Sequence, residues 1–155
     1  MVDFKNLLLP YPNFAVQKDN VEFYKENNVR SVFHQGSREM SDELCCLRSY
    51  ILAKQLWDTD VDVNALLGKY LKVTYGEAAE YIAEYIDLMH ESVRTEADDL
   101  DLYDRTEDHY DDYLSNENVE RYLALTQSAL TAAEGDELLT GCVAEIRIHP
   151  HSAPI

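Results

Sequence analysis

Apolar residues recur at spacings of three and four over most of this chain, which is the period of helices that bury one face. The clearest example is a stretch in which Ile82, Tyr85 and Met89 fall on one side. Earlier in the chain, Ser41 suits a helix N-cap and begins a long helical stretch. The pattern predicts helices over 16–27, 41–57, 63–74, 77–93 and 115–133, and a helix over 136–148 that Gly141 interrupts.

Two short apolar runs near the start have the pattern of β-strands instead of helices. "FKNLLLP" (4–10) stops at a proline, and "VRSVFHQG" (29–36) is rich in β-branched residues and closes on a glycine. The helix expected between them predicts two parallel strands joined by a right-handed crossover. Two parallel strands make a poor sheet alone, because parallel sheets need more strands and cover on both faces. We therefore expect the front of this chain to be the end of a larger α/β structure.

Acidic side chains at Asp58, Asp60 and Asp62 alternate as oxygen ligands do at the start of a calcium loop. Such a loop needs glycine at its sixth position and glutamate at its twelfth, where this chain has Val63 and Lys69. We therefore interpret these acids as a junction between two helices, with Asp60 or Asp62 capping the second.

Other candidate metal ligands are equally unsupported by their spacing. The acidic run 96–112 is interpreted as a solvated loop or frayed helix, because it offers no rigid ligand cage. His90 and His109 each lack a second histidine or cysteine three or four residues later. Cys45 and Cys46 are interpreted as buried small hydrophobes within a helix. The sequence predicts no metal and no cofactor.

Charge limits the classes of partner. The 155 residues carry 30 acids and 13 bases, a formal net charge of −17. A surface this acidic repels phosphate backbones and anionic lipid, so neither a nucleic acid nor a membrane is expected as partner. No apolar run reaches the roughly 18–20 residues needed to cross a bilayer. The N-terminus lacks the basic start and cleavage site of a signal peptide.

The best candidates for chemistry follow the two expected strands, where α/β folds place their sites. Tyr11 and Asn13 come after the first strand, and His34 and Gln35 come after the second. Aromatic rings with amide and imidazole groups bind sugars by stacking and by hydrogen bonds. The alternative is that Tyr11 is a packing residue and that His34 is a satisfied polar group at a strand end. No catalytic residue is assigned.

Several stretches resemble a known family. "NLLLPYPNF", "VEFYKENNVRSVFHQGS" and the helical run that follows are similar to the C-terminal part of a large glycoside-hydrolase-like family, catalogued as domain of unknown function four-eight-three-eight. The resemblance extends over about residues 3–140. Its most specific residues are Leu47, Arg48, Tyr50, Leu56, Trp57, Asp58, Tyr75 and Gly76.

The resemblance implies a mainly α chain that begins with the last two β/α units of a (β/α)8 (TIM) barrel, like that of alpha-glucuronidases and beta-hexosaminidases. Residues 1–57 would be the end of the barrel, 58–148 a helical region and 149–155 a loose tail. The family typically has glutamate where this chain has His34. That difference puts activity in doubt.

The function expected from this resemblance is that of a C-terminal fragment of a carbohydrate-active protein, contributing part of a sugar-site rim. Glycosidases need two carboxylates flanking the bond they break, and neither expected strand end supplies one. We therefore expect the chain alone to be inactive. Its partners would be a carbohydrate, through the parent barrel, and the missing N-terminal portion of that barrel. Members of the family look exported, yet this chain carries no export signal. The alternative is a non-enzymatic helical interaction module.

Overall fold

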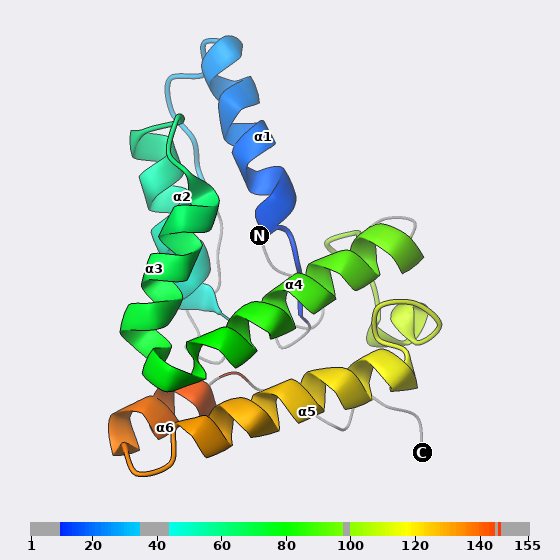
Figure 1. The fold of residues 1–155 in the computed structure, drawn as a ribbon. Coiled ribbons are helices and arrows are strands. Elements are labelled where there is room, and N and C mark those ends of the chain that lie inside the picture. The colour runs from blue at the N-terminus through cyan, green and yellow to red at the C-terminus, as the bar shows by residue number, and fades with distance from the viewer. Residues whose placement is uncertain (1–9, 35–43, 98–99, 145, 147–155) are drawn as a thin grey trace.

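The computed structural model describes residues 10–34, 44–97, 100–144 and 146. Helices make up all the regular structure of these residues (Figure 1). The α-helices are α1 (Phe14–Glu26), α2 (Cys45–Trp57), α3 (Val63–Tyr75), α4 (Ala79–Glu96), α5 (Asn116–Ala132) and α6 (Glu137–Ala144). Two 3₁₀ helices, η1 (Gly76–Ala78) and η2 (Thr106–His109), precede α4 and α5.

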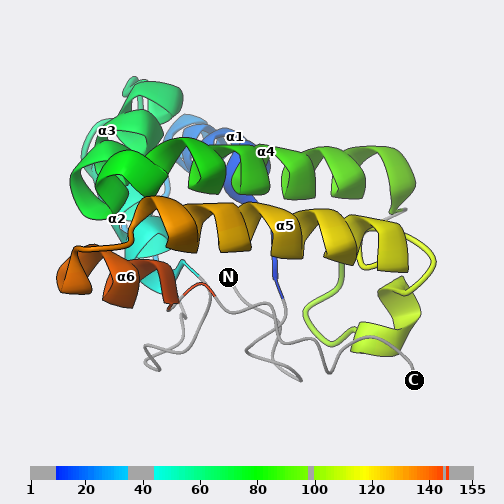
Figure 2. The same ribbon diagram turned by 60° about the horizontal axis from the view of Figure 1, so that its bottom comes forward.

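The two longest helices form the centre of the arrangement. Helices α4 and α5 run antiparallel along each other (Figure 2). At one end, α3 packs against α4 and runs antiparallel to α2, with α1 beside α2 and α6 against α3 and α5 (Figure 1). The described core therefore gathers where α2, α3, α4 and α5 converge.

The core is built from the apolar stripes that the three-and-four spacing predicts. Ile82, Tyr85 and Met89 of α4 are almost fully buried, which confirms the stripe expected there. The rings of Tyr85 and Tyr122 meet edge to face, with centroids 5.7 Å apart, a geometry that aromatic pairs favour. The same apolar cluster contains Phe14 and residues of α2 to α6. This cluster therefore contains residues from both of the regions expected from the sequence, 1–57 and 58–148.

The expected β/α barrel end is wrong. Residues 29–34 form no strand, and no strand occurs elsewhere in the described residues. The first expected strand lies outside them, except for Pro10. A strand needs a neighbour to complete its backbone hydrogen bonds, and no backbone group between Arg30 and Phe33 has a hydrogen-bond partner among the described residues. Asn28, at φ 57°, also turns the chain directly after α1. The fold is all-helical within the described residues.

Side-chain oxygens cap helices α3 and α5, and the first of these caps is the one predicted at Asp62. The Asp62 carboxylate accepts a hydrogen bond from the backbone N–H of Ala65 at 3.0 Å, and so caps α3. The Ser115 hydroxyl caps α5 in the same way. The N-cap predicted at Ser41 lies outside the described residues, and α2 begins at Cys45. Within the described residues, no helix is long and apolar enough to cross a membrane.

Candidate functional site

The turn that leads into α1 is fixed by Arg48 of α2. The Arg48 guanidinium donates from Nη1 to the carbonyl oxygen of Tyr11 at 2.5 Å and to Oδ1 of Asn13 at 2.9 Å. It also lies 5.3 Å from the centre of the Phe14 ring, within cation–π range. Arg48 is 8% exposed, so these charge-assisted bonds form largely away from water, where they are strong. One buried cation therefore brings together two residues predicted to bind sugar.

The side chains of Tyr11 and Asn13 are engaged within the protein. The Tyr11 hydroxyl donates to the carbonyl oxygen of Leu100 at 3.0 Å, and the residue is buried. The carboxamide oxygen of Asn13 accepts from Arg48. This geometry fits the alternative in which Tyr11 is a packing residue. A sugar hydroxyl would compete with both internal bonds, and sugar binding at this turn stays a prediction.

The other two predicted residues belong to the segment after α1. His34 is half-buried, and its burial lowers the pKa of the imidazole. It has no hydrogen bond or ion pair with another described residue. Gln35 lies outside the described residues. The structure therefore links Tyr11 to Asn13 through Arg48, but gives no bond that links either residue to His34.

His90 of α4 holds the first turn of α1. Its Nε2 accepts from the backbone N–H of Phe14 at 3.1 Å, and its Nδ1 lies 2.8 Å from the carbonyl oxygen of Ile86. A carbonyl oxygen only accepts, so the proton sits on Nδ1 and the ring is neutral. Burial lowers the pKa of His90, and the nearby charge of Arg48 acts in the same direction. His90 therefore supplies the cap that the Asn13 side chain does not provide.

A second polar cluster lies in the acidic segment between α4 and α5. His109 is buried, at 5% exposed. Its Nδ1 is 2.9 Å from Oδ2 of Asp112, and its Nε2 is 3.1 Å from Oδ2 of Asp104. Burial lowers the pKa of His109, but the hydrogen bonds and charges of the two aspartates outweigh it and raise the pKa overall. The segment is therefore organised around a buried histidine, and is neither a plain solvated loop nor a frayed helix.

Tyrosine hydroxyls connect this cluster to the turn before α1. The Tyr122 hydroxyl donates to the carbonyl oxygen of Tyr113 at 3.0 Å, and the Tyr113 hydroxyl donates to that of Pro10 at 3.2 Å. The rings of Tyr113 and His109 are 4.9 Å apart. Sequence reasoning missed both His109 and Arg48 as organising residues. The available signal for His109 was a lone histidine with aspartates five residues before and three residues after it.

An exposed apolar surface lies around the C-terminal end of α2 and the segment after α1. We name it the apolar end, and define it as Val29, Val32, Phe33, Leu56 and Trp57. Three of its members, Val29, Val32 and Leu56, line one hollow of about 530 Å³. The two aromatic members stand out further, because Trp57 is 92% exposed and Phe33 is 88% exposed. Lys25 also lines the hollow, and its Nζ donates to Oγ1 of Thr59 at 2.6 Å.

The acids and thiols form no metal centre in the described part of the chain. At the start of the former calcium candidate, the Asp58 carboxylate accepts from the backbone N–H of Asp60 at 3.0 Å, and so acts as a turn residue. Cys46 and Cys142 are free thiols. Cys45 is half-buried and Cys46 is exposed, so the expectation that both are buried is wrong for Cys46.

Comparison with known proteins identifies a family. No curated protein and no solved structure matches this chain. Residues 1–87, more than half of the 155, match the family described as Domain of unknown function (DUF4838). The match contains α1, α2 and α3 together with every residue of the apolar end. The chain belongs to this family, the Domain of unknown function (DUF4838).

Proposed function

We propose that this chain is a non-enzymatic helical interaction module that docks through its apolar end onto a carbohydrate-active protein. The observation that carries the proposal is the exposure of Trp57 and Phe33, at 92% and 88%. Single exposed apolar residues are common on protein surfaces. Here the two aromatic residues directly follow Val32 and Leu56 in the chain, and these two residues line a hollow together with Val29. We therefore infer that the aromatic side chains extend this hollow into one docking surface.

The energetics favour burial of this surface by a partner. Removing one large apolar side chain from water contributes about 1.5–3 kcal/mol, and tryptophan is frequent among the residues that dominate binding energy. The backbone from Arg30 to Phe33 also has no hydrogen-bond partner among the described residues. A partner that places a strand along this segment would add backbone hydrogen bonds to the apolar contacts.

The carbohydrate-active class of the partner rests on the resemblance to glycoside-hydrolase-like proteins. The acidic charge supports it indirectly, because a net charge of −17 disfavours nucleic acid and anionic lipid. A share in the partner's sugar-site rim, through Tyr11, Asn13, His34 and Gln35, is part of the same proposal. The catalytic carboxylates would belong to the partner. Hydrolysis of aryl glycosides by the purified chain would contradict this division of roles.

Recovery of the partner from the native host tests the proposal. The tagged chain is compared with the double variant Trp57→Lys/Phe33→Lys, and recovered proteins are quantified by mass spectrometry. The matched control is Val73→Lys/Leu138→Lys, because Val73 and Leu138 are also highly exposed, at 78% and 77%, but lie outside the apolar end. All forms are first checked for equal helicity and cooperative unfolding.

We expect the unmodified chain and the control variant to recover the same carbohydrate-active protein, and the apolar-end variant to lose it. Equal recovery by all three forms would contradict docking through the apolar end. Selective recovery of a protein with no carbohydrate-active domain would support the surface but contradict the class of partner.

A further inference from the structure

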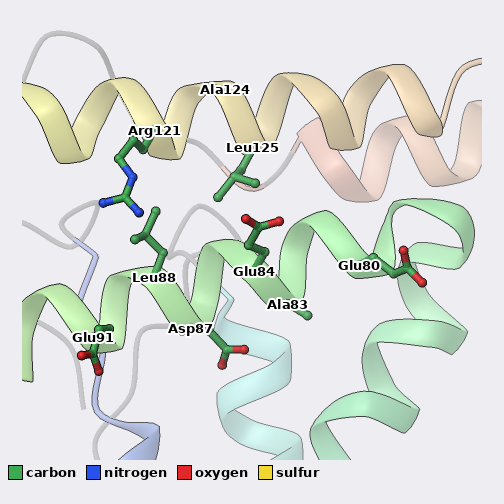
Figure 3. A pocket seen from close by; sticks show the side chains of 9 residues that line it. All are labelled: Glu80, Ala83, Glu84, Asp87, Leu88, Glu91, Arg121, Ala124 and Leu125. Atoms are coloured by element: carbon green, nitrogen blue, oxygen red, sulfur yellow. The ribbon is translucent and has the colours of Figure 1, made fainter.

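A second surface follows the line where α4 and α5 meet. A groove of about 760 Å³ lies between the helices, and its apolar lining consists of Ala83 and Leu88 from α4 with Ala124 and Leu125 from α5. Figure 3 shows Leu88 and Leu125 lying between the two helices, with Glu84 and Arg121 beside them. The two alanines leave room for another chain to approach the helix backbones. The groove shares no residue with the apolar end.

Carboxylates line the α4 side of this groove. Glu80, Glu84, Asp87 and Glu91 follow one another at spacings of four, three and four, which places them along one side of the helix. Among these four carboxylates, Glu91 forms an ion pair within the described residues, since its Oε1 lies 2.5 Å from Nη2 of Arg94. The other three have no ion pair with a described residue. Helix α5 contributes a single cation, Arg121, to the lining.

We propose that the α4–α5 groove binds a basic amphipathic helix of a partner protein. The apolar lining would accept leucine-like side chains along one side of that helix, as grooves that bind helical peptides do. Lysine or arginine side chains flanking this apolar side would meet the unpaired carboxylates of Glu80, Glu84 and Asp87. The module would then carry two docking surfaces, and binding at the groove does not depend on the apolar end.

Groove length and composition favour a helix over a small cation. Glu91 lies 11 positions after Glu80, so the carboxylates extend over about 16 Å along α4. Three turns of a partner helix cover that distance. A small cation would need several oxygen ligands converging on one point, and no such group occurs in the described residues. The apolar lining gives specificity that charge attraction alone does not supply.

The test uses a labelled amphipathic peptide of leucine and lysine, about 14 residues long, so that it spans about four helical turns. Its binding to the full chain is followed by fluorescence anisotropy. The comparison peptide has the same composition in an order that separates leucine from lysine along the chain, so it has no amphipathic face. The protein variants are Glu84→Lys/Asp87→Lys in the groove and Asp19→Lys/Glu26→Lys on the exposed surface of α1. Both variants change the net charge equally.

We expect saturable one-to-one binding of the amphipathic peptide and weaker binding of the comparison peptide. The groove variant should lose at least about tenfold in affinity, while the α1 variant changes it by less than about twofold. Equal losses in the two variants would contradict the proposal, because the overall negative charge would then explain binding. Equal affinities for the two peptides would also contradict it. So would equally strong binding of spermine, measured by competition at a matched concentration of positive charge, because the groove would then show no preference for the peptide.

Discussion

The imidazole of His109 lies between two carboxylates, and its closest contact joins Nδ1 to Oδ2 of Asp112 at 2.9 Å. The opposite ring nitrogen, Nε2, lies 3.1 Å from Oδ2 of Asp104. Ionised carboxylates are acceptors only, so both bonds form together only when both ring nitrogens carry protons. Protonation of the buried imidazole therefore lets His109 hold the acidic segment between α4 and α5 through both bonds at once.

This arrangement predicts a defined pH dependence of stability. The pKa of His109 is raised above its ordinary value of 6.5. A basic group whose pKa is higher in the folded state stabilises the protein fully below its unfolded-state pKa, and this stabilisation is lost as pH rises through the folded-state pKa. We expect the free energy of unfolding to fall over that window in the native chain. The His109→Gln variant should not show this decrease.

Urea unfolding at a series of pH values measures this difference, and the NMR titration of the His109 ring gives the folded-state pKa directly. His90 must be accounted for, because its lowered pKa has the opposite effect. Its contribution is present above its unfolded-state pKa and is lost as pH falls through the folded-state value. Because His90 is present in both the native chain and the variant, the difference between their stabilities removes its contribution. If the free energy of unfolding depends on pH in the variant as it does in the native chain, then the protonation of His109 does not contribute to stability.

Arg48 provides a second prediction, at the turn before α1. Replacement by methionine keeps much of the aliphatic volume but removes the donor to Tyr11 and Asn13. Hydrogen bonds to charged groups are worth about 1.5–3 kcal/mol each, and the substitution removes two of them. We expect Arg48→Met to lower the free energy of unfolding by at least about 2 kcal/mol. Arg30→Met, at an exposed position, should change it by less than about 0.5 kcal/mol in the same urea experiment.

Two glycines should respond to alanine in opposite directions. Gly76 ends α3 at φ 49° and ψ −120°, and a Cβ added there would lie 3.0 Å from Cδ1 of Leu139. Gly76→Ala should therefore cost on the order of 1–3 kcal/mol. Gly68 lies within α3 with nothing within 4 Å of an added Cβ. Gly68→Ala should stabilise the chain by up to about 1 kcal/mol. Thermal unfolding measures both variants. A shift of the unfolding temperature in the same direction for the two would contradict this account.

The buried carboxamide of Gln55 predicts a stabilising substitution. Gln55 is 1% exposed, and neither its oxygen nor its nitrogen has a hydrogen-bond partner in the described part of the chain. Methionine has a similar length and brings no polar group, so Gln55→Met should raise the free energy of unfolding by about 1–3 kcal/mol. Gln127→Met on the exposed surface of α5 is the control. A loss of stability in Gln55→Met alone would mean that the carboxamide has a partner in solution.

The sequence predicts the helices well because their signal is local. Spacings of three and four identify α3, α4 and α5 to within a few residues at each end. The apolar stripe of α1 is less clear, since Val16 is 54% exposed while Phe14 and Val21 are buried. Several registers of a short, weakly amphipathic helix look similar until its neighbour is known.

The misassigned features depend on contacts that sequence spacing does not reveal. A β-branched run such as 29–36 becomes a strand only beside another strand. The role of Arg48 arises because α2 packs against the turn at Tyr11 and Asn13, more than thirty residues earlier. His109 stands among so many acids that the segment reads as solvated. Its burial follows from the packing of Tyr113 and Tyr122, which the composition of the run does not show.

The most direct test of the docking proposal places a photoreactive p-benzoylphenylalanine at position 57 of the chain in its native host. A second form carries it at position 73, because Val73 is also highly exposed, at 78%, but lies outside the apolar end. After irradiation, cross-linked proteins are identified by mass spectrometry. The account predicts a cross-link from position 57 to a carbohydrate-active protein and none from position 73. Equal cross-linking from both positions, or none from position 57, would contradict it.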